Sequence, residues 1–199
     1  EKADIFLGLS GPRTATQEMI KKMARDPLVF ALANPTPEIM PELVREVRPD
    51  AIMATGRSDY PNQVNNALCF PYIFRGALDV GATAINEAMK IATVNAIAEL
   101  ATLEPNEVVA KAYGGQELRF GREYLIPKPL DPRLIQVIAP AVAKAAMESG
   151  VATRNINDFA AYTQGLNKYI YRSSMFMRPV MNAAKIKPQR IILCEGEEE

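Results

Sequence analysis

The sequence predicts an α/β fold: the latter part of a doubly wound, Rossmann-like parallel sheet, followed by C-terminal helices. Three short and continuously apolar runs carry this prediction: DIFLGLS at 4–10, LVFALA at 28–33 and AIMAT at 51–55. Segments with helical periodicity lie between them, as the crossovers of a parallel sheet require. We expect the strands to be buried on both faces, because the runs lack an alternation of polar and apolar residues.

Each predicted strand stops at residues that disfavour its continuation. Gly11-Pro12 follows the first run, Asn34-Pro35 the second and Gly56 the third. Proline cannot donate a hydrogen bond to a sheet, so Pro12 and Pro35 end the first two strands. Gly56 weakens the continuation of the third. In doubly wound sheets, ligands bind beyond the carboxyl ends of the strands. The segments 10–11, 34–36 and 56–59 are therefore the expected binding edge.

Helices are expected between and after these runs. In TATQEMIKKMA, Thr14 and Gln17 have the spacing of a capping box. Residues 40–47 predict a second helix, and the pattern is helical again from 77 to 100. We expect Asp131 to cap the last helix, with Pro132 at its first position and Gly150 at its end.

Composition excludes several classes of function. Lys and Arg number 23, as do Asp and Glu, so the formal net charge is +0. That balance argues against a protein that binds nucleic acid or a membrane surface. The chain has no histidine, which excludes Ser-His-Asp and Cys-His catalysis and histidine-ligated metals within it. Cys69 and Cys194 are expected to be buried, reduced thiols in a cytoplasmic protein.

Four amide side chains, Asn62, Gln63, Asn65 and Asn66, fall within five positions after the third run. They predict either a turn or a site that binds a polar ligand through neutral hydrogen bonds. Arg57 and Asp59, just before them, are expected to form a salt bridge within the loop.

The two ends of the chain suggest cuts through longer folded segments. We therefore expect a fragment of a longer protein. Residues 1–150 would form the C-terminal part of one domain, 151–173 a connector and 174–199 the start of another domain.

The strings VFALANPTPE, AIMATGRSDYPNQVNNALCFPYIFRGALD and IPKPLDPRLIQVIAPAVAKAAMESGVA resemble the nicotinamide-binding domain of bacterial malic enzymes. The tail, KPQRIILCEGEEE, resembles the start of a phosphate acetyltransferase-like domain. Large bacterial malic enzymes combine the two domains. The resemblance implies oxidative decarboxylation of (S)-malate to pyruvate and CO2 with reduction of NADP+ or NAD+. It also implies Mg2+ or Mn2+, bound by residues outside this chain, and catalytic residues upstream of Glu1.

The same resemblance implies particular site residues. Asn34 would contact both the cofactor and malate, as would Asn66, and Asn65 would contact malate. Ser10 and Gly11 would lie along the cofactor because they follow a strand end, although a loop turn explains them equally well. The resemblance further implies a homo-oligomer and an acetyl-CoA effector at the C-terminal domain.

Two other functions fit the residues. The intact protein could be an acyltransferase or an acyl-CoA-binding regulatory protein with a non-catalytic nicotinamide-type scaffold. It could also be a non-catalytic α/β scaffold whose amide loop is only a turn.

Overall fold

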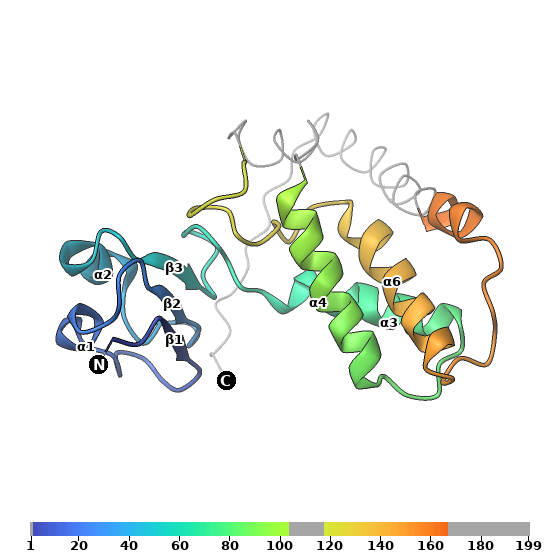
Figure 1. Cartoon of the computed structure of the whole chain (residues 1–199), viewed down its shortest axis with the longest axis horizontal. Coiled ribbons are helices and arrows are strands. Elements are labelled where there is room, and N and C mark those ends of the chain that lie inside the picture. The colour runs from blue at the N-terminus through green and yellow to red at the C-terminus, as the bar shows by residue number, and fades with distance from the viewer. Residues whose placement is uncertain (1, 104–117, 167–199) are drawn as a thin grey trace, which may run out of the picture. The chain divides into compact units, whose positions relative to one another are not determined.

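A computed structural model describes residues 2–103 and 118–166 of the chain (Figure 1). The chain divides into two compact units, Glu1–Asn157 and Asp158–Glu199. In the second unit, residues 159–166 are helical. The predicted domain beginning at residue 174 lies outside the described residues, so the predicted boundaries stay predictions.

Within the described residues, one parallel sheet has the order β1-β2-β3, with strands β1 (Ile5–Gly8), β2 (Leu28–Ala31) and β3 (Ile52–Thr55). The register aligns the three strand ends, because Gly8 pairs with Ala31, and Ala31 with Thr55. Helices α1 (Gln17–Lys21) and α2 (Pro41–Val47) form the crossovers. This arrangement confirms the predicted α/β class and all three predicted strands.

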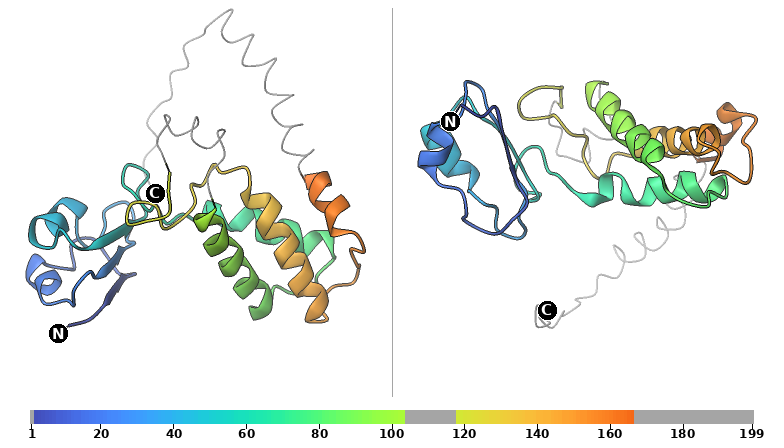
Figure 2. Two further views of the ribbon diagram at one scale, coloured as in Figure 1. Left: turned by 45° about the horizontal axis from the view of Figure 1, so that its top comes forward. Right: turned by 60° about the horizontal axis from the view of Figure 1, so that its bottom comes forward.

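Both crossover helices lie on one side of the sheet (Figures 1 and 2). Ile20 of α1 and Val44 of α2 pack with Val29 in one buried cluster. On the opposite face of β1, Ile5 and Leu7 are 57% and 59% exposed. The expected burial of both faces is therefore wrong for β1, because the described helices between the strands cover a single face.

The cap of α1 also differs from the expectation. The helix begins at Gln17, and the hydroxyl of Thr16 accepts a hydrogen bond from the Met19 N–H at 3.3 Å. Thr14 instead donates to the Gly11 carbonyl at 3.0 Å and so closes the preceding loop. The side chain of Gln17 donates to the Leu43 carbonyl of α2, a tertiary contact that local spacing does not reveal.

A helical part follows the sheet, formed by α3 (Phe70–Asp79), α4 (Glu87–Thr102) and α6 (Leu134–Glu148). The predicted continuous helical pattern at 77–100 is broken at Gly81, whose φ is +58°. Asn86 then caps α4, because its Oδ1 accepts from the Met89 N–H at 3.1 Å.

Helix α6 packs against both α3 and α4 (Figure 2). It begins at Leu134 rather than at Pro132. The carboxylate of Asp131 is held instead by Arg133, with a 2.9 Å bond from its N–H and a 2.7 Å ion pair to its guanidinium. Gly150, at φ +74°, follows the last turn, as predicted.

None of the described helices is both long enough and apolar enough to cross a membrane.

Candidate functional site

The carboxyl ends of the three strands form one edge of the sheet, from which three loops extend. Gly8, Ala31 and Thr55 are in register at this edge. Ser10 and Gly11 lie in the first loop, Asn34 lies in the second, and the amide cluster follows the third strand. The topology therefore places every residue of the predicted site in a segment that follows the same edge of the sheet.

The first two loops are joined by the carboxylate of Glu38, which is 0% exposed. Its Oε1 accepts from the Ser10 N–H at 2.9 Å, and its Oε2 accepts from the Ala33 N–H at 3.0 Å. The loop after β1 is held further by backbone bonds, from Arg13 N–H to the Pro37 carbonyl and from Ala15 N–H to the Glu38 carbonyl, both 3.1 Å.

Glu38 is ionised in this environment. Burial acts to raise the pKa of its carboxyl group, but the hydrogen bonds from the backbone N–H groups of Ala33 and Ser10 outweigh burial. The pKa of Glu38 is therefore held below its ordinary value of 4.5. A carboxylate that accepts several N–H bonds can stay charged inside a protein, because those bonds replace the water it lost.

Asn34 stands next to this buried carboxylate but is itself exposed. It precedes Pro35 through a cis peptide bond. Among the described residues, no partner accepts or donates a hydrogen bond to the Asn34 side chain. Ser10 is also exposed, and its hydroxyl lies 3.1 Å from that of Thr14. The Asn34 amide can therefore bind a ligand without first breaking a bond within the described structure.

The amide cluster after β3 contains one residue with a structural role, Asn62. It is 2% exposed and has a φ of +54°, a conformation that asparagine tolerates better than most residues. Its Nδ2 donates to the carbonyls of Met53 at 2.9 Å and Arg122 at 2.7 Å. Its Oδ1 accepts from the Leu125 N–H at 2.7 Å. Asn62 therefore attaches the turn around residue 122 to the edge strand β3.

The side chains of the other three amides differ in their hydrogen-bond partners. Gln63 donates to the Gly56 carbonyl at 3.3 Å, which keeps it in the loop. Asn65 precedes the 3-10 helix η1 (Asn66–Leu68), and its Oδ1 accepts from the Ala67 N–H at 2.9 Å. The exposed side chain of Asn66 makes no hydrogen bond within the described parts of the chain. The turn interpretation therefore holds for Asn62 and Gln63, whereas ligand binding at Asn65 and Asn66 stays a prediction.

Charged residues of the same loop form a network outside the amide cluster. Arg57 binds Asp59 through two contacts, 2.9 Å and 2.7 Å, which confirms the predicted loop salt bridge. That hydrogen-bonded guanidinium lowers the pKa of Asp59. The Tyr60 hydroxyl donates to Glu42, which raises the pKa of Tyr60 and lowers that of Glu42.

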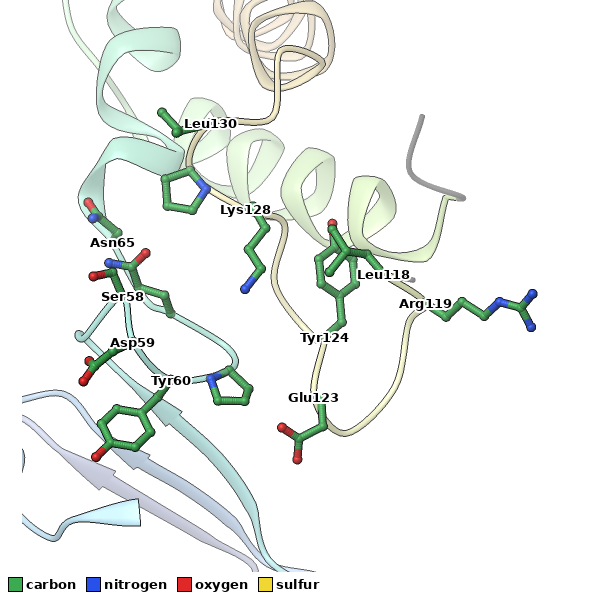
Figure 3. Close-up of a pocket in the computed structure, with 13 residues that line it drawn as sticks. Ser58, Asp59, Tyr60, Asn65, Leu118, Arg119, Glu123, Tyr124, Lys128 and Leu130 are labelled. Carbon is green, nitrogen blue, oxygen red and sulfur yellow. The ribbon is translucent and has the colours of Figure 1, made fainter. Parts of the chain in front are cut away.

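A cavity of about 1180 Å³ lies between the loop after β3 and the segment that precedes α6 (Figure 3). Its lining comprises Ser58, Asp59, Tyr60, Pro61, Gln63, Asn65, Leu118, Arg119, Glu123, Tyr124, Lys128, Pro129 and Leu130. In Figure 3 the Lys128 side chain extends into the space between the two segments, whereas Arg119 points away. Of the five predicted site residues, only Asn65 is among the lining residues.

The predicted site residues at this edge carry uncharged hydrogen-bonding groups. Carboxamides and backbone groups beyond a parallel sheet can bind hydroxyl, amide and carboxylate groups of a ligand without adding charge. The described residues contain no group of three or more Asp, Glu, Cys or His side chains placed to hold a metal. The prediction that Mg2+ or Mn2+ is bound outside this chain stays a prediction.

Sequence reasoning missed Glu38 and the structural role of Asn62. Glu38 occurs within ANPTPE, where an acidic residue between two apolar neighbours, Pro37 and Ile39, was the available signal. For Asn62 no local signal existed, because its partners Arg122 and Leu125 lie about 60 residues further along the chain.

Comparison with known proteins assigns this arrangement to a family. Residues 1–111 match the family described as malic enzyme, NAD binding domain. The chain is 68% identical to the NADP-dependent malic enzyme of Escherichia coli, over 100% of this chain and 26% of that protein. It is 61% identical to the NAD-dependent malic enzyme of Rhizobium meliloti, over 99% of this chain and 26% of that protein. The chain thus spans about a quarter of the length of these relatives.

Solved structures agree with the sequence relatives. The malic enzyme of Entamoeba histolytica has a TM-score of 0.79 at 32% identity, over 95% of this chain and 36% of that chain. The malic enzyme of Pyrococcus horikoshii has a TM-score of 0.69 at 38% identity, over 94% of this chain and 39% of that chain. Neither likeness favours an acyltransferase or a non-catalytic scaffold. The parallel sheet, the loops at its edge and the matched family together place this chain in the malic enzyme family, with residues 1–111 in its NAD-binding domain.

Proposed function

We propose that the intact protein catalyses the oxidative decarboxylation of (S)-malate to pyruvate and CO2 with reduction of NADP+. The observation that carries the proposal is the family match over residues 1–111, together with 68% identity to a relative named NADP-dependent malic enzyme. Because this chain spans about a quarter of that relative, it contributes part of the site. The bound dinucleotide supplies the acceptor for the hydride that leaves malate.

Within this chain, Asn34 and Asn66 orient malate and the nicotinamide ring, and Asn65 contacts malate. Their carboxamides donate hydrogen bonds to carboxylate and hydroxyl oxygens without adding a charge to a site that already holds several. Fixing the two reactants in this way lowers the entropic part of the barrier. The support is structural: the Asn34 and Asn66 side chains are exposed and form no hydrogen bond with the described residues. Ser10 and Gly11 lie along the cofactor.

The preference for NADP+ over NAD+ belongs to the same proposal. A relative named as using NAD is 61% identical to this chain, so identity within this region alone does not separate the two cofactors. The test is malate-dependent formation of NADPH by the intact protein with Mg2+, and with Mn2+ and NAD+ in parallel reactions. Reduction that requires malate and metal supports the proposal, and reduction of neither cofactor contradicts it.

We further propose that the intact protein is a cytoplasmic homo-oligomer with acetyl-CoA as an effector at its C-terminal domain. Cys69 is half-buried, not buried as expected, and its thiol is free, which fits a reducing compartment. Phe70, Phe74 and Leu78 are exposed on one side of α3. An exposed apolar patch of this kind fits an interface between copies of the protein. The effector proposal rests on the resemblance of residues 187–199, and a change of malate turnover on adding acetyl-CoA tests it.

A further inference from the structure

We infer that Glu38 is a positioning residue, whose buried carboxylate sets the spacing of the two loops that carry Ser10–Gly11 and Asn34 against the dinucleotide. The inference rests on the proposed cofactor role of those loops. The carboxylate itself is 0% exposed, so it acts through its neighbours rather than by touching the cofactor.

The two oxygens of the Glu38 carboxylate bind different loops. One oxygen binds the Ser10 N–H at 2.9 Å in the loop after β1, and the other binds the Ala33 N–H at 3.0 Å in the loop after β2. Ala33 directly precedes Asn34. A single rigid group therefore joins two separate loops at the backbone atoms adjacent to their proposed ligand contacts.

Only an ionised carboxylate can accept a hydrogen bond from both loops at once. Two N–H donors converge on two oxygens, and each oxygen must accept. A carboxamide of the same size presents one oxygen and one NH2 group, so one backbone N–H would face another donor. A buried N–H without an acceptor is costly, so the loop that carries it would move away.

The carboxylate of Glu38 lies close to the backbone of β1 at Gly8. A Cβ atom at Gly8 would lie 2.5 Å from the carboxyl carbon of Glu38 and 2.8 Å from each oxygen. The carboxylate therefore sits directly against the backbone at the end of β1. Because the nearest atoms belong to the flexible end of Glu38, an alanine at position 8 would displace the carboxylate rather than the strand.

The experiment compares the intact wild-type protein with Glu38→Gln, Gly8→Ala and the control Val44→Ala. Val44 is fully buried in the core of the same sheet unit, and its apolar side chain makes none of the hydrogen bonds of the two loops, so it reports the effect of lost packing. The measurements are NADPH affinity by fluorescence, kcat and KM for malate turnover, and the midpoint of thermal unfolding. If Glu38→Gln does not fold, Gly8→Ala provides the same test.

Both Glu38→Gln and Gly8→Ala are expected to weaken NADPH binding at least about tenfold, the effect of one lost charge-assisted hydrogen bond. The KM for NADP+ should rise in step, with kcat changed by less than about threefold. Val44→Ala should lower the unfolding midpoint without this loss of affinity.

The two proposals fail in different ways. If Glu38→Gln and Gly8→Ala both bind NADPH as tightly as Val44→Ala does, Glu38 has no positioning role, whatever their rates of malate turnover. The same holds if the wild-type protein binds no NADPH. A wild-type protein that binds NADPH but does not oxidise malate contradicts the proposed function, and the affinities of the variants still decide the role of Glu38.

Discussion

The carboxamide of Asn66 lies at the start of η1, exposed and without a hydrogen bond to any described residue. Its neighbour Asn65 uses its Oδ1 to cap η1 at 2.9 Å from the Ala67 N–H. The two adjacent asparagines thus differ, because Asn65 holds the turn with its Oδ1 and has its amide nitrogen for the proposed contact with malate, whereas Asn66 has its whole carboxamide for a ligand. Substitution of Asn65 should therefore affect both the loop and ligand binding, and substitution of Asn66 ligand binding alone.

We expect Asn66→Ala in the intact protein to lower kcat/KM for malate or for the cofactor by about tenfold or more, the effect of a lost hydrogen bond to a charged group. The thermal unfolding midpoint should be unchanged, because the side chain is exposed and holds nothing in place. Steady-state kinetics with each substrate varied in turn measure the effect. An unchanged kcat/KM for both would remove Asn66 from the site.

Asn62 is the opposite case, since it is buried and uses three hydrogen bonds within the protein. Asn62→Ala should lower the free energy of unfolding by about 1–3 kcal/mol, because buried groups lose their partners. Asn62→Gly should cost less, because glycine adopts the φ of +54° without strain. Thermal unfolding of both variants measures this, and equal midpoints would show that backbone conformation contributes nothing here.

The stability that Glu38 contributes depends on pH with a defined sign. The pKa of its carboxyl is below its ordinary 4.5 in the folded protein, so the folded state binds the proton less well than the unfolded chain. The contribution is therefore complete above about pH 4.5 and is lost as the pH falls through the lower folded pKa. The difference in unfolding midpoint between wild type and Glu38→Gln should shrink over that window. A difference independent of pH would contradict an ionised Glu38.

At the scale of elements, the sheet edge is built by register and by loop bonds together. Parallel pairing aligns Gly8, Ala31 and Thr55, and Glu38 then joins the loops beyond the first two strands. At β3, Asn62 joins the edge strand to the turn that contains Arg122, whose guanidinium also reaches Asp26 at 3.2 Å. Within the described residues β3 is the last strand of the sheet, and Asn62 attaches it to the turn around residue 122.

The crossing of α3 and α6 depends on a glycine. A Cβ atom at Gly76 would lie 2.4 Å from the Ala139 carbonyl oxygen and 2.9 Å from the Val142 Cβ. Because one contact is with backbone, Gly76→Ala would push the helices apart, and we expect a loss of about 1–3 kcal/mol in unfolding free energy. Gly165→Ala, with nothing within 4 Å of the added atom, is the matched control. Chemical denaturation of both variants tests the contrast, and equal stabilities would refute the close crossing.

At the scale of the whole molecule, the exposed apolar face of α3 bears on assembly. Phe70, Phe74 and Leu78 recur every four residues, with exposures of 62%, 43% and 67%. We expect Leu78→Glu to lower the molecular mass of the intact protein in sedimentation, because a charge in a dry interface is costly. Met19→Glu, an equally exposed change on α1, should leave the mass unaltered. A monomeric wild-type protein would contradict the proposed oligomer.

The local pattern of the sequence by itself determined the α/β class, the three strands and the end of α6 at Gly150, because strand formation and helix termini depend on neighbouring residues. It also determined the family, through strings such as ANPTPE and QVNN. Only the tertiary structure decided that Thr16 rather than Thr14 caps α1, that Asn62 is structural while Asn66 is exposed, and that Glu38 joins two loops. The roles of Asn62 and Glu38 depend on where distant segments meet, and hydrogen bonds between residues far apart in the chain leave no periodicity in the sequence. The cap of α1 is local, but Thr14 and Thr16 are both residue types that cap helices, so only the backbone geometry decides between them.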